Sequence, residues 1–598
     1  MQASTKNDEM ETPLPYDPIK FSRIMMNVAD RAQPIIQEVI NQYAEMKPED
    51  MDPLNIQETY IDFLNSWAQR PEKLAQMQME YWSKWSELWQ ESALKFLGEP
   101  SETIYKPEKG DRRFKSELWD ENVYFDFLKQ SYLMTSKWMH DMVHSTEDMS
   151  VEDLERLDFY TRQFADALAP TNFIMTNPDV LKETIDSNGE NLIRGLENLL
   201  EDIKRGGGKL KISMTDYDAF ELGKNIAVTP GQVIYQNDLI QLIQYEPTTD
   251  KVFKRPLLIV PPWINKYYIL DLKAENSLIK WLVDQGHTVF CISWVNPGPD
   301  LADKDFADYI DDGILASLTE IEKITGEPDV NTIAYCIGGT LMTMALAYMK
   351  SQKQDNKIAS VTYLTTLIDF EQSGELKMFS SNKTLEKITQ DMQDKGLLEA
   401  SHLQKTFSML RANDLIWSFI INNYMMGREP FPFDLLYWND DSTNMPATMH
   451  RNYLRDMYRD NKLVQKDALS VHDTPVDIET IETPAYFLST RDDHIAPWIG
   501  TYKGAQHLSG PVTFTLAASG HIAGVVNPPA KNKYCFWTSD KLPESSDDWM
   551  AGAKEQAGSW WPHWQNWVKE FTGKKVDARR PKKGLEAAPG SYVKMQSK

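Results

Sequence analysis

The chain has 598 residues, of which 41% are apolar and 18 are Trp, and its formal net charge is −25 at pH 7. It is too long for one ordinary domain and has enough apolar side chains for a large core, so two structural units are expected. The acidic balance argues against general nucleic-acid binding, because neutralising phosphates requires an excess of Lys and Arg. An anionic substrate would need a binding site that is a local exception to this negative electrostatic field.

The three cysteines are odd in number and far apart, so neither a disulfide framework nor a CxxC zinc site is predicted. This cysteine usage fits a reducing cytoplasm. The first twenty residues lack the apolar core of a signal peptide, and no uninterrupted apolar run reaches the length that spans a membrane. The protein is therefore expected to be neither exported by that route nor embedded in a membrane.

Residues 1–205 are predicted to form an α-helical domain, because apolar residues recur there with a helical period and β-branched clusters are few. Two interpretations stay open for an aromatic stripe on one helix face: it packs on its own domain, or it forms an adhesive face for a partner or an apolar particle. The Gly-rich segment 205–211 marks a turn or linker and lacks the spacing of a phosphate-binding loop. The stripe consists of Trp82, Trp85, Trp89, Ala93 and Phe96.

From about residue 230, short β-branched runs alternate with helical stretches, which is typical of a largely parallel sheet covered on both faces. Residues 206–598 are therefore predicted to form one α/β domain. A long aromatic-rich insertion at about 369–475 is expected to cap the strand ends, and the basic segment from about 574 to 598 to be an extended or mobile tail. The strand candidates lie at 256–262, 287–294, 331–335, 359–367, 485–490 and 512–517.

The segment NTIAYCIGGT predicts a strand, a sharp turn and a helix, with Cys336 at the apex. In such a nucleophile elbow, Gly338 and Gly339 let the turning backbone pack closely, and the NH of Ile337 points at the oxygen of the attacked carbonyl. Compared with the hydrolase pattern GxSxG, Cys replaces Ser and Ala334 replaces the first Gly. A lone cysteine before two glycines is weak evidence, because free cysteines are often simply buried.

Two later loops supply the partners that this elbow requires. The segment RDDHIAPW follows the strand candidate at 485–490 and contains two aspartates, and ASGHIAGV follows the last candidate and contains His521. The order nucleophile, acid, histidine is the one that α/β-hydrolase folds use. Because these strand ends meet at one edge of the sheet, we predict a triad of Cys336, His521 and one of the two aspartates.

The roles of the predicted triad follow from ordinary pKa values. A free thiol has a pKa of ~8.5, so an imidazole that takes its proton increases the reactive thiolate, and a carboxylate on the far imidazole nitrogen fixes the tautomer. A second oxyanion donor is expected from the loop PPWINKYYILDL, at the NH of Trp263 or Ile264. Asn265, Tyr267 and His494 are expected close to the triad. No metal ligand stands at suitable spacing from His494, so no metal site is predicted.

Six separated segments resemble the polyhydroxyalkanoate synthases, most closely the class I enzymes that work without a separate partner subunit. The resemblance covers nearly the whole chain and implies Cys336 as acyl-carrying nucleophile, His521 as general base and Asp493, rather than Asp492, as third member. It departs from the family at Ala334, where Gly is usual. The segments are YCIGGT around residue 336, PPWINKYYILDL at 261–272, FDLLYWNDDSTNMP at 433–446, RDDHIAPW at 491–498, SGHIAGVVNPPAKNKY at 519–534 and GSWWPHW at 558–564.

The resemblance implies polymerisation of (R)-3-hydroxyacyl-CoA with release of CoA, and short monomers such as 3-hydroxybutyryl-CoA. It also implies no cofactor, a homodimer as the active form, and residence on polyester granules in the cytoplasm. The aromatic stretch from Trp417 to Trp438 is expected to act as a lid that excludes water. Whether Asp493 mainly orients His521 or helps to activate the incoming hydroxyl stays open.

Two other functions also stay open. A thioesterase or other hydrolase would share the elbow and the triad but would release free acid. A structural coat protein of hydrophobic inclusions would adhere through the aromatic stripe, although an intact triad argues against this as its sole role.

Overall fold

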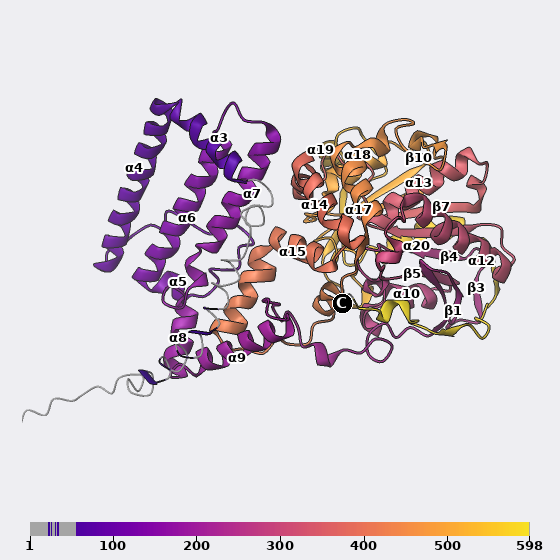
Figure 1. The fold of residues 1–598 in the computed structure, drawn as a ribbon, viewed down its shortest axis with the longest axis horizontal. Coiled ribbons are helices and arrows are strands. Elements are labelled where there is room, and N and C mark those ends of the chain that lie inside the picture. Colours follow the sequence, from indigo (N-terminus) through magenta and orange to yellow (C-terminus); the bar gives the residue numbers. More distant parts are fainter. Residues whose placement is uncertain are drawn as a thin grey trace, which may run out of the picture. The chain divides into compact units, whose positions relative to one another are not determined.

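The computed structural model of the chain describes residues 56–596 and seven positions between 22 and 37 (Figure 1). The prediction about the first twenty residues therefore falls outside the described residues. Two compact units are present, one comprising Met1–Met214 with Arg411–Phe431 and the other Thr215–Leu410 with Pro432–Lys598. Among the described residues, no helix is both long enough and apolar enough to cross a membrane.

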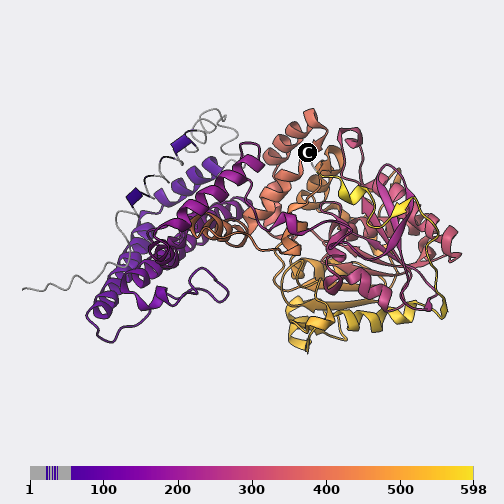
Figure 2. The ribbon, with the colours of Figure 1, turned by 90° about the horizontal axis from the view of Figure 1, so that it is seen from below.

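The first unit is helical, as predicted. Asn122, Ser150 and Asn177 begin three of its helices by accepting hydrogen bonds from first-turn NH groups. Helix α6 lies between α4 and α7 (Figures 1 and 2). The helices are α3 (Ile56–Ala68), α4 (Pro71–Phe96), α5 (Leu118–Glu121), α6 (Val123–His144), α7 (Val151–Ala167), α8 (Pro178–Asp186) and α9 (Glu190–Arg205).

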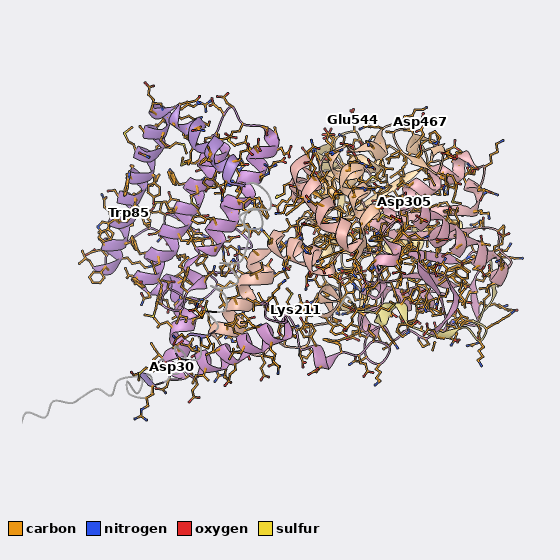
Figure 3. All side chains as sticks on the ribbon, viewed as in Figure 1. Asp30, Trp85, Lys211, Asp305, Asp467 and Glu544 are labelled. Carbon is orange, nitrogen blue, oxygen red and sulfur yellow. The ribbon has the colours of Figure 1, made fainter. Side chains whose placement is uncertain are left out.

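Helix α4 exposes most of the aromatic stripe to solvent. Trp82, Trp89 and Phe96 are 63%, 56% and 78% exposed, whereas Leu88 is fully buried. Trp85, which is labelled on α4 in Figure 3, is half-buried. Its ring stacks on Trp89 with the centroids 5.7 Å apart. Trp85 therefore fits the interpretation that the stripe packs on its own domain. The exposed rings leave open the other interpretation, an adhesive face for a partner or an apolar particle.

Residues 411–431, which the sequence analysis assigns to the cap insertion, pack with the helical unit instead. A Cβ on Gly195 of α9 would lie 1.9 Å from the Tyr424 carbonyl oxygen, so the two backbones are in close contact. The Asn191 side-chain amide donates to the carbonyl of Met425 at 2.8 Å. Contacts through backbone and amide groups produce no apolar periodicity in the sequence. The sequence pattern therefore does not separate residues 411–431 from the rest of the insertion.

The second unit is built on an eleven-stranded sheet whose centre consists of parallel strands. The six predicted strands form this centre, and burial on both faces explains their continuous apolar runs. In spatial order they are β5 (Val289–Trp294), β4 (Leu257–Val260), β6 (Val330–Tyr335), β7 (Ile358–Leu364), β12 (Ala485–Thr490) and β13 (Val512–Ala517).

Antiparallel strands that the sequence analysis did not identify extend the sheet on both sides. Beyond β5 lie β2 (Ile240–Tyr245), β1 (Gly231–Gln236) and β17 (Glu586–Ala587), and beyond β13 lie β14 (Cys535–Thr538) and β15 (Lys554–Ala557). The C-terminal segment is extended, as predicted, but it is bonded to the domain. In addition to β17 pairing with β1, β16 (Lys575–Asp577) pairs with β3 (Lys251–Phe253).

Apolar clusters cover both faces of the sheet. Leu258 and Val260 of β4 belong to one cluster, and Leu257 and Ile259 belong to the other, so alternate side chains serve opposite layers. Helices cover the sheet and form the cap that remains in this unit. They are α10 (Leu278–Asp284), α11 (Phe306–Asp308), α12 (Ala316–Thr325), α13 (Ile337–Ser351), α14 (Asn382–Lys395), α15 (Ala400–Leu410), α16 (Asp434–Asp440), α17 (Ala447–Asn452), the π-helical η11 (Tyr453–Arg459), α18 (Trp498–Ala505), α19 (Ser546–Gly552) and α20 (Trp561–Val568).

Candidate active site

Cys336 stands at a strained turn between β6 and α13, as the elbow pattern predicts. Its φ of 53° and ψ of −126° are unusual for a residue with a side chain and cost about 1–3 kcal/mol. Close packing holds the turn, because a Cβ on Gly338 would lie 2.5 Å from the Val260 carbonyl oxygen, and one on Gly339 would lie 2.1 Å from Thr366 Oγ1. The reason predicted for both glycines is confirmed. The Cys336 thiol is free and half-buried.

Ala334 lies within β6 and not in the turn itself. It pairs with Val260 of β4 and Tyr363 of β7, and it is fully buried in one of the apolar clusters. Its methyl therefore occupies core volume beside the elbow.

Ala334→Gly is expected to change turnover by less than about tenfold, or 1.4 kcal/mol of barrier. It is also expected to lower the free energy of unfolding by about 1–2 kcal/mol, because it removes a buried methyl and loosens a strand. Initial CoA release and chemical denaturation measure the two effects. Ala485→Gly, at a fully buried position in β12, should lose similar stability with unchanged turnover. A larger change in turnover for Ala334→Gly would show that the methyl acts on the elbow.

The structure brings Asp493 to His521. Asp493 Oδ2 lies 2.7 Å from His521 Nδ1, and the two side chains are 0% and 8% exposed. Asp492, by contrast, is 59% exposed and lies 3.6 Å from the Arg491 guanidinium. The choice between the two aspartates, which the resemblance suggested, therefore agrees with the geometry.

The loop after β12 fixes the Asp493 carboxylate. Its Oδ1 accepts the NH groups of Ile495 and Ala496 at 2.8 and 2.9 Å. Thr490 Oγ1 donates to Oδ2 at 3.2 Å, beside the imidazole. Both carboxylate oxygens are thus engaged within the protein, and the side chain is held toward His521.

His521 interacts with the other two members of the predicted triad. Burial disfavours its charged form, but the Asp493 carboxylate and the Cys336 side chain outweigh this and raise the pKa of His521 to about 10. Cys336 is also a hydrogen-bond partner of the imidazole. The ring also stacks on Tyr335, with centroids 5.6 Å apart. The predicted residues therefore meet at the carboxyl ends of β6, β12 and β13.

The three predicted oxyanion donors lie at this same edge. Ile337 is the first residue of α13, where backbone NH groups have no acceptor within the helix. Trp263 and Ile264 follow β4, and in the described part of the chain their NH groups donate to no backbone acceptor. Trp263 and Ile337 are 2% and 1% exposed, so their NH groups are poorly hydrated and suited to a developing negative charge.

A segment of the cap, residues 438–443, is bonded to the loop after β4; we call this segment the strap. The Trp438 indole NH donates to the Lys266 carbonyl at 2.7 Å, and the Thr443 NH donates to the Ile264 carbonyl at 3.2 Å. A β-bridge joins Asn265 to Ser442 between these bonds. The loop that carries two predicted oxyanion donors is thus positioned by the cap.

A buried ion pair joins the strap to the same loop. Lys266 Nζ lies 2.6 Å from Asp441 Oδ1, with the side chains 3% and 14% exposed, and the Tyr268 hydroxyl donates to Oδ2 at 2.9 Å. Burial lowers the pKa of Lys266 and raises the pKa of Asp441. Both residues lie in segments that carry the resemblance, but nothing in their spacing pairs them, so the sequence analysis missed this contact.

Asp441→Asn is expected to lower the free energy of unfolding by about 3 kcal/mol, because it leaves the Lys266 charge buried without its partner. The double variant Lys266→Met, Asp441→Leu should recover most of this loss, since no buried charge is left. Chemical denaturation measures both effects. Asp284→Asn removes an exposed pair with Lys280 and should change stability by less than about 0.5 kcal/mol. A double variant no better than Asp441→Asn would contradict this account.

The residues expected around the triad fall into different surroundings. His494 is half-buried and directly follows Asp493, and Asn265 is held by the strap, with its buried Oδ1 finding no partner in residues 56–596. Tyr267 differs, because its hydroxyl donates to the Pro589 carbonyl at 3.5 Å and interacts with Tyr245. The structure does not bring that hydroxyl to the triad.

The predicted lid from Trp417 to Trp438 is not one element. Trp417 belongs to the helical unit, and Trp438 lies in the strap of the other unit. Two aromatic residues of the cap that do interact with Cys336 lie in η11: burial raises the pKa values of Tyr453 and Tyr458, and Cys336 adds to this rise. Sequence alone does not single out these tyrosines, because a tyrosine in a helical insertion is as easily a core residue.

Comparisons with known proteins agree with the fold. Residues 110–282 match the family described as "Poly-beta-hydroxybutyrate polymerase (PhaC) N-terminus", and residues 256–528 match the alpha/beta hydrolase fold. The chain is 45% identical over 534 residues to the poly(3-hydroxyalkanoate) polymerase subunit PhaC of Rhizobium meliloti (89% of this chain, 87% of that one). It is 45% identical over 537 residues to the poly(3-hydroxyalkanoate) polymerase of Methylorubrum extorquens (89% and 88%). It is 41% identical over 547 residues to the PhaC subunit of Cupriavidus necator (90% and 91%). The chain therefore belongs to the poly(3-hydroxyalkanoate) polymerase family and has the α/β-hydrolase fold.

Proposed function

We propose that this protein is a polyhydroxyalkanoate synthase, which polymerises 3-hydroxyacyl-CoA thioesters through an acyl group carried on Cys336. The observation that supports this most directly is a cysteine at a strained elbow beside a buried His521 and Asp493 pair. In a member of this family, such a cysteine has the chemistry needed to accept an acyl group from CoA.

In the first step, the Cys336 thiolate attacks the thioester carbonyl of the acyl-CoA. The bond from the carbonyl carbon to the CoA sulfur breaks, and CoA leaves with a proton from the His521 imidazolium. The NH of Ile337 and that of Trp263 or Ile264 stabilise the oxyanion, each contributing about 3 kcal/mol. One thioester replaces another, so the acyl group keeps its activation.

In the second step, the neutral imidazole of His521 takes the proton from the 3-hydroxyl of the next unit or of the chain end. The alkoxide oxygen attacks the carbonyl held on Cys336, the carbon–sulfur bond breaks, and an ester forms. The cysteine sulfur is then ready for the next acyl-CoA. Transfer from a thioester to an alcohol is downhill, and this drives chain growth. Burial of Tyr453 and Tyr458 near Cys336 supports the exclusion of water from this step.

The role we propose for Asp493 is to orient His521 and stabilise its charged form. Both carboxylate oxygens already accept hydrogen bonds, and the side chain has no exposed surface. A group held in this way is poorly placed to take a proton from an incoming hydroxyl.

The family resemblance supports finer proposals about substrate and setting. We propose that the substrates are (R)-3-hydroxyacyl-CoAs with short side chains, such as 3-hydroxybutyryl-CoA, and that no cofactor takes part. We also propose a homodimer that works on the surface of polyester granules in the cytoplasm.

The deciding experiment follows CoA release from defined (R)-3-hydroxyacyl-CoAs of increasing length while the insoluble product is weighed. We expect CoA release to be matched by insoluble polyester, fastest for the short substrates. CoA release with only soluble 3-hydroxy acid would instead identify a thioesterase. No CoA release from any of them would leave a structural coat protein as the better interpretation.

The exposed stripe on α4 favours adhesion to an apolar surface beside catalysis. Replacing Trp82 and Trp89 together by Ser is expected to weaken binding of the full chain to polyester beads by at least about tenfold, because two large exposed rings are lost. CoA release from soluble substrate at the earliest times should stay within about twofold of the wild type. Replacing exposed Tyr124 by Ser is the control, and bead binding as strong in the double variant as in the wild type would contradict adhesion through α4.

A further inference from the structure

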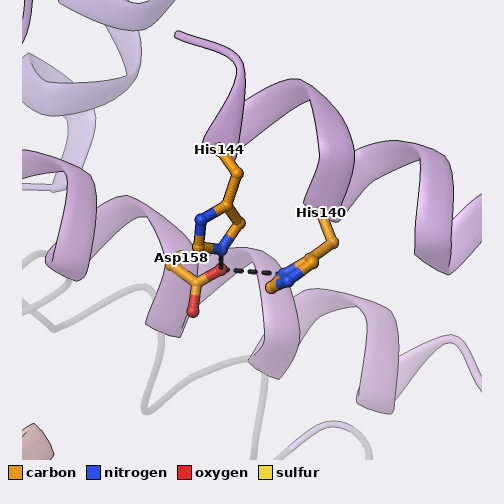
Figure 4. Close-up of side chains that lie close together, drawn as sticks. All are labelled: His140, His144 and Asp158. Atoms are coloured by element: carbon orange, nitrogen blue, oxygen red, sulfur yellow. Dashed lines mark hydrogen bonds and ion pairs between the residues drawn. The ribbon is translucent and has the colours of Figure 1, made fainter.

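Two imidazoles and one carboxylate meet on the helical unit, in a cluster that the proposed reaction does not use (Figure 4). Asp158 Oδ1 lies 2.9 Å from His140 Nδ1 and 3.0 Å from His144 Nε2. The donor atoms of all three side chains lie within 4.8 Å of one another. One carboxylate oxygen is therefore shared by two imidazole nitrogens.

The local sequence explains why these side chains converge. His140 and His144 are four residues apart on α6, so they share one face of the helix, and Asp158 lies opposite them on α7. Met142 and Val143 of α6 and Leu157 of α7 are buried in the core of this unit. The cluster therefore lies next to buried residues that pack α6 and α7 in one core, so the backbone that carries its side chains is held in place.

We propose that His140, His144 and Asp158 bind a zinc-like divalent transition-metal ion, which links α6 to α7. Two imidazole nitrogens and one carboxylate oxygen are ligands that Zn²⁺ accepts, whereas Mg²⁺ and Ca²⁺ prefer oxygen ligands throughout. The imidazoles are 48% and 58% exposed, which leaves room for water at the remaining coordination positions.

The geometry and charge of the cluster suit a single metal ion. The centroids of the two rings are 4.1 Å apart, so both rings are close enough to bind the same ion. The Asp158 carboxylate adds an electrostatic attraction for a cation. The Arg162 guanidinium competes with the ion, because its Nε lies 3.2 Å from Asp158 Oδ2.

The test is a zinc titration of the full-length protein, monitored by calorimetry, after a chelator has removed bound metal. We expect one zinc ion per chain at this site, with affinity at least tenfold lower in His140→Ala and in His144→Ala. Arg162→Ala should bind zinc more tightly, because it removes the competing charge from Asp158. A purely structural network of hydrogen bonds would not give this increase.

Two controls make the outcome decisive. His472→Ala removes an exposed imidazole that pairs with Asp311 at 2.8 Å. Among the described residues, this pair belongs to no cluster of three metal-binding side chains, so zinc binding should not change. Cys336→Ala tests whether zinc binds at the proposed catalytic site instead; we expect binding to persist. Circular dichroism and the milder variants His140→Gln and His144→Gln guard against misfolding.

Binding of Co²⁺ gives an independent readout. We expect visible absorption typical of nitrogen and oxygen ligands in the wild type and in Cys336→Ala, and its loss in His144→Ala. The proposal is overturned if the wild type binds no zinc, if His144→Ala and His144→Gln bind it as tightly as the wild type, or if Cys336→Ala abolishes binding. None of these results depends on polymerase activity, so zinc binding and the proposed function are tested separately.

Discussion

Cys336→Ala is expected to abolish polymer formation and to lower initial CoA release by about 10⁴-fold or more, as removal of a nucleophile does in other covalent mechanisms. Without the sulfur, no acyl group is carried by the protein, and the bound thioester meets no strong nucleophile. The measurement is CoA release together with the mass of insoluble product. Cys336→Ser should also be severely impaired, because an ester on serine loses the activation that a thioester keeps.

Cys535→Ala is the matched control for this experiment. Its thiol is also free and half-buried, but burial raises the pKa of Cys535, and the charged groups that act on it are Glu555 and Arg491. Activity in this variant should stay within about twofold of the wild type. Polymer formation by Cys336→Ala at more than one thousandth of the wild-type rate would disprove the covalent mechanism.

Asp493→Asn is expected to lower turnover by about 10³- to 10⁴-fold, because the amide neither fixes the useful tautomer of His521 nor stabilises its charge. The same change should lower the pKa of His521 from about 10, because the carboxylate that helps to raise it is removed. Selective isotopic labelling of the histidines and a titration followed by NMR measure this shift. Asp492→Asn, on an exposed side chain, should change neither quantity.

The raised pKa of His521 also predicts how stability depends on pH. A histidine whose pKa is higher in the folded than in the unfolded protein stabilises the fold fully below the unfolded value, about 6.5, and this contribution is lost as the pH rises toward 10. The difference in unfolding free energy between wild type and Asp493→Asn should therefore shrink across that range. A difference that stays constant from pH 6 to pH 10 would mean that the imidazole and the carboxylate are not coupled.

The central sheet and the meeting of Cys336, His521 and Asp493 were predictable from sequence because each leaves a local signal. Buried parallel strands appear as short apolar runs. The elbow at Cys336 is indicated by two glycines, which the close approach of Val260 and Thr366 requires. His521 and Asp493 follow strands whose order in the fold is regular. Choosing Asp493 over its neighbour needed the family resemblance, since both aspartates sit in the same loop.

The features that were missed arise from pairing between distant parts of the chain. The flanking strands β1 and β2 carry Gln among their apolar residues. In β2, Gln241 and Gln244 are buried, and both bond to the C-terminal segment. The ion pair of Lys266 with Asp441 joins two separated segments, and nothing in their sequence spacing indicates that these two residues pair. The cluster on α6 and α7 is also invisible locally, since His140 and His144 gain their third partner from another helix.

The C-terminal segment has a further consequence through β17, which borders β1. Glu586 and Ala587 pair with Val233 and Gln232, so they occupy hydrogen-bonding groups that would otherwise face solvent. An unpaired strand at a sheet border is a template for association with another chain. Proteolysis just before Glu586 would uncover that template, and a shortened protein would then tend to aggregate through β1 although the proposed triad is unchanged.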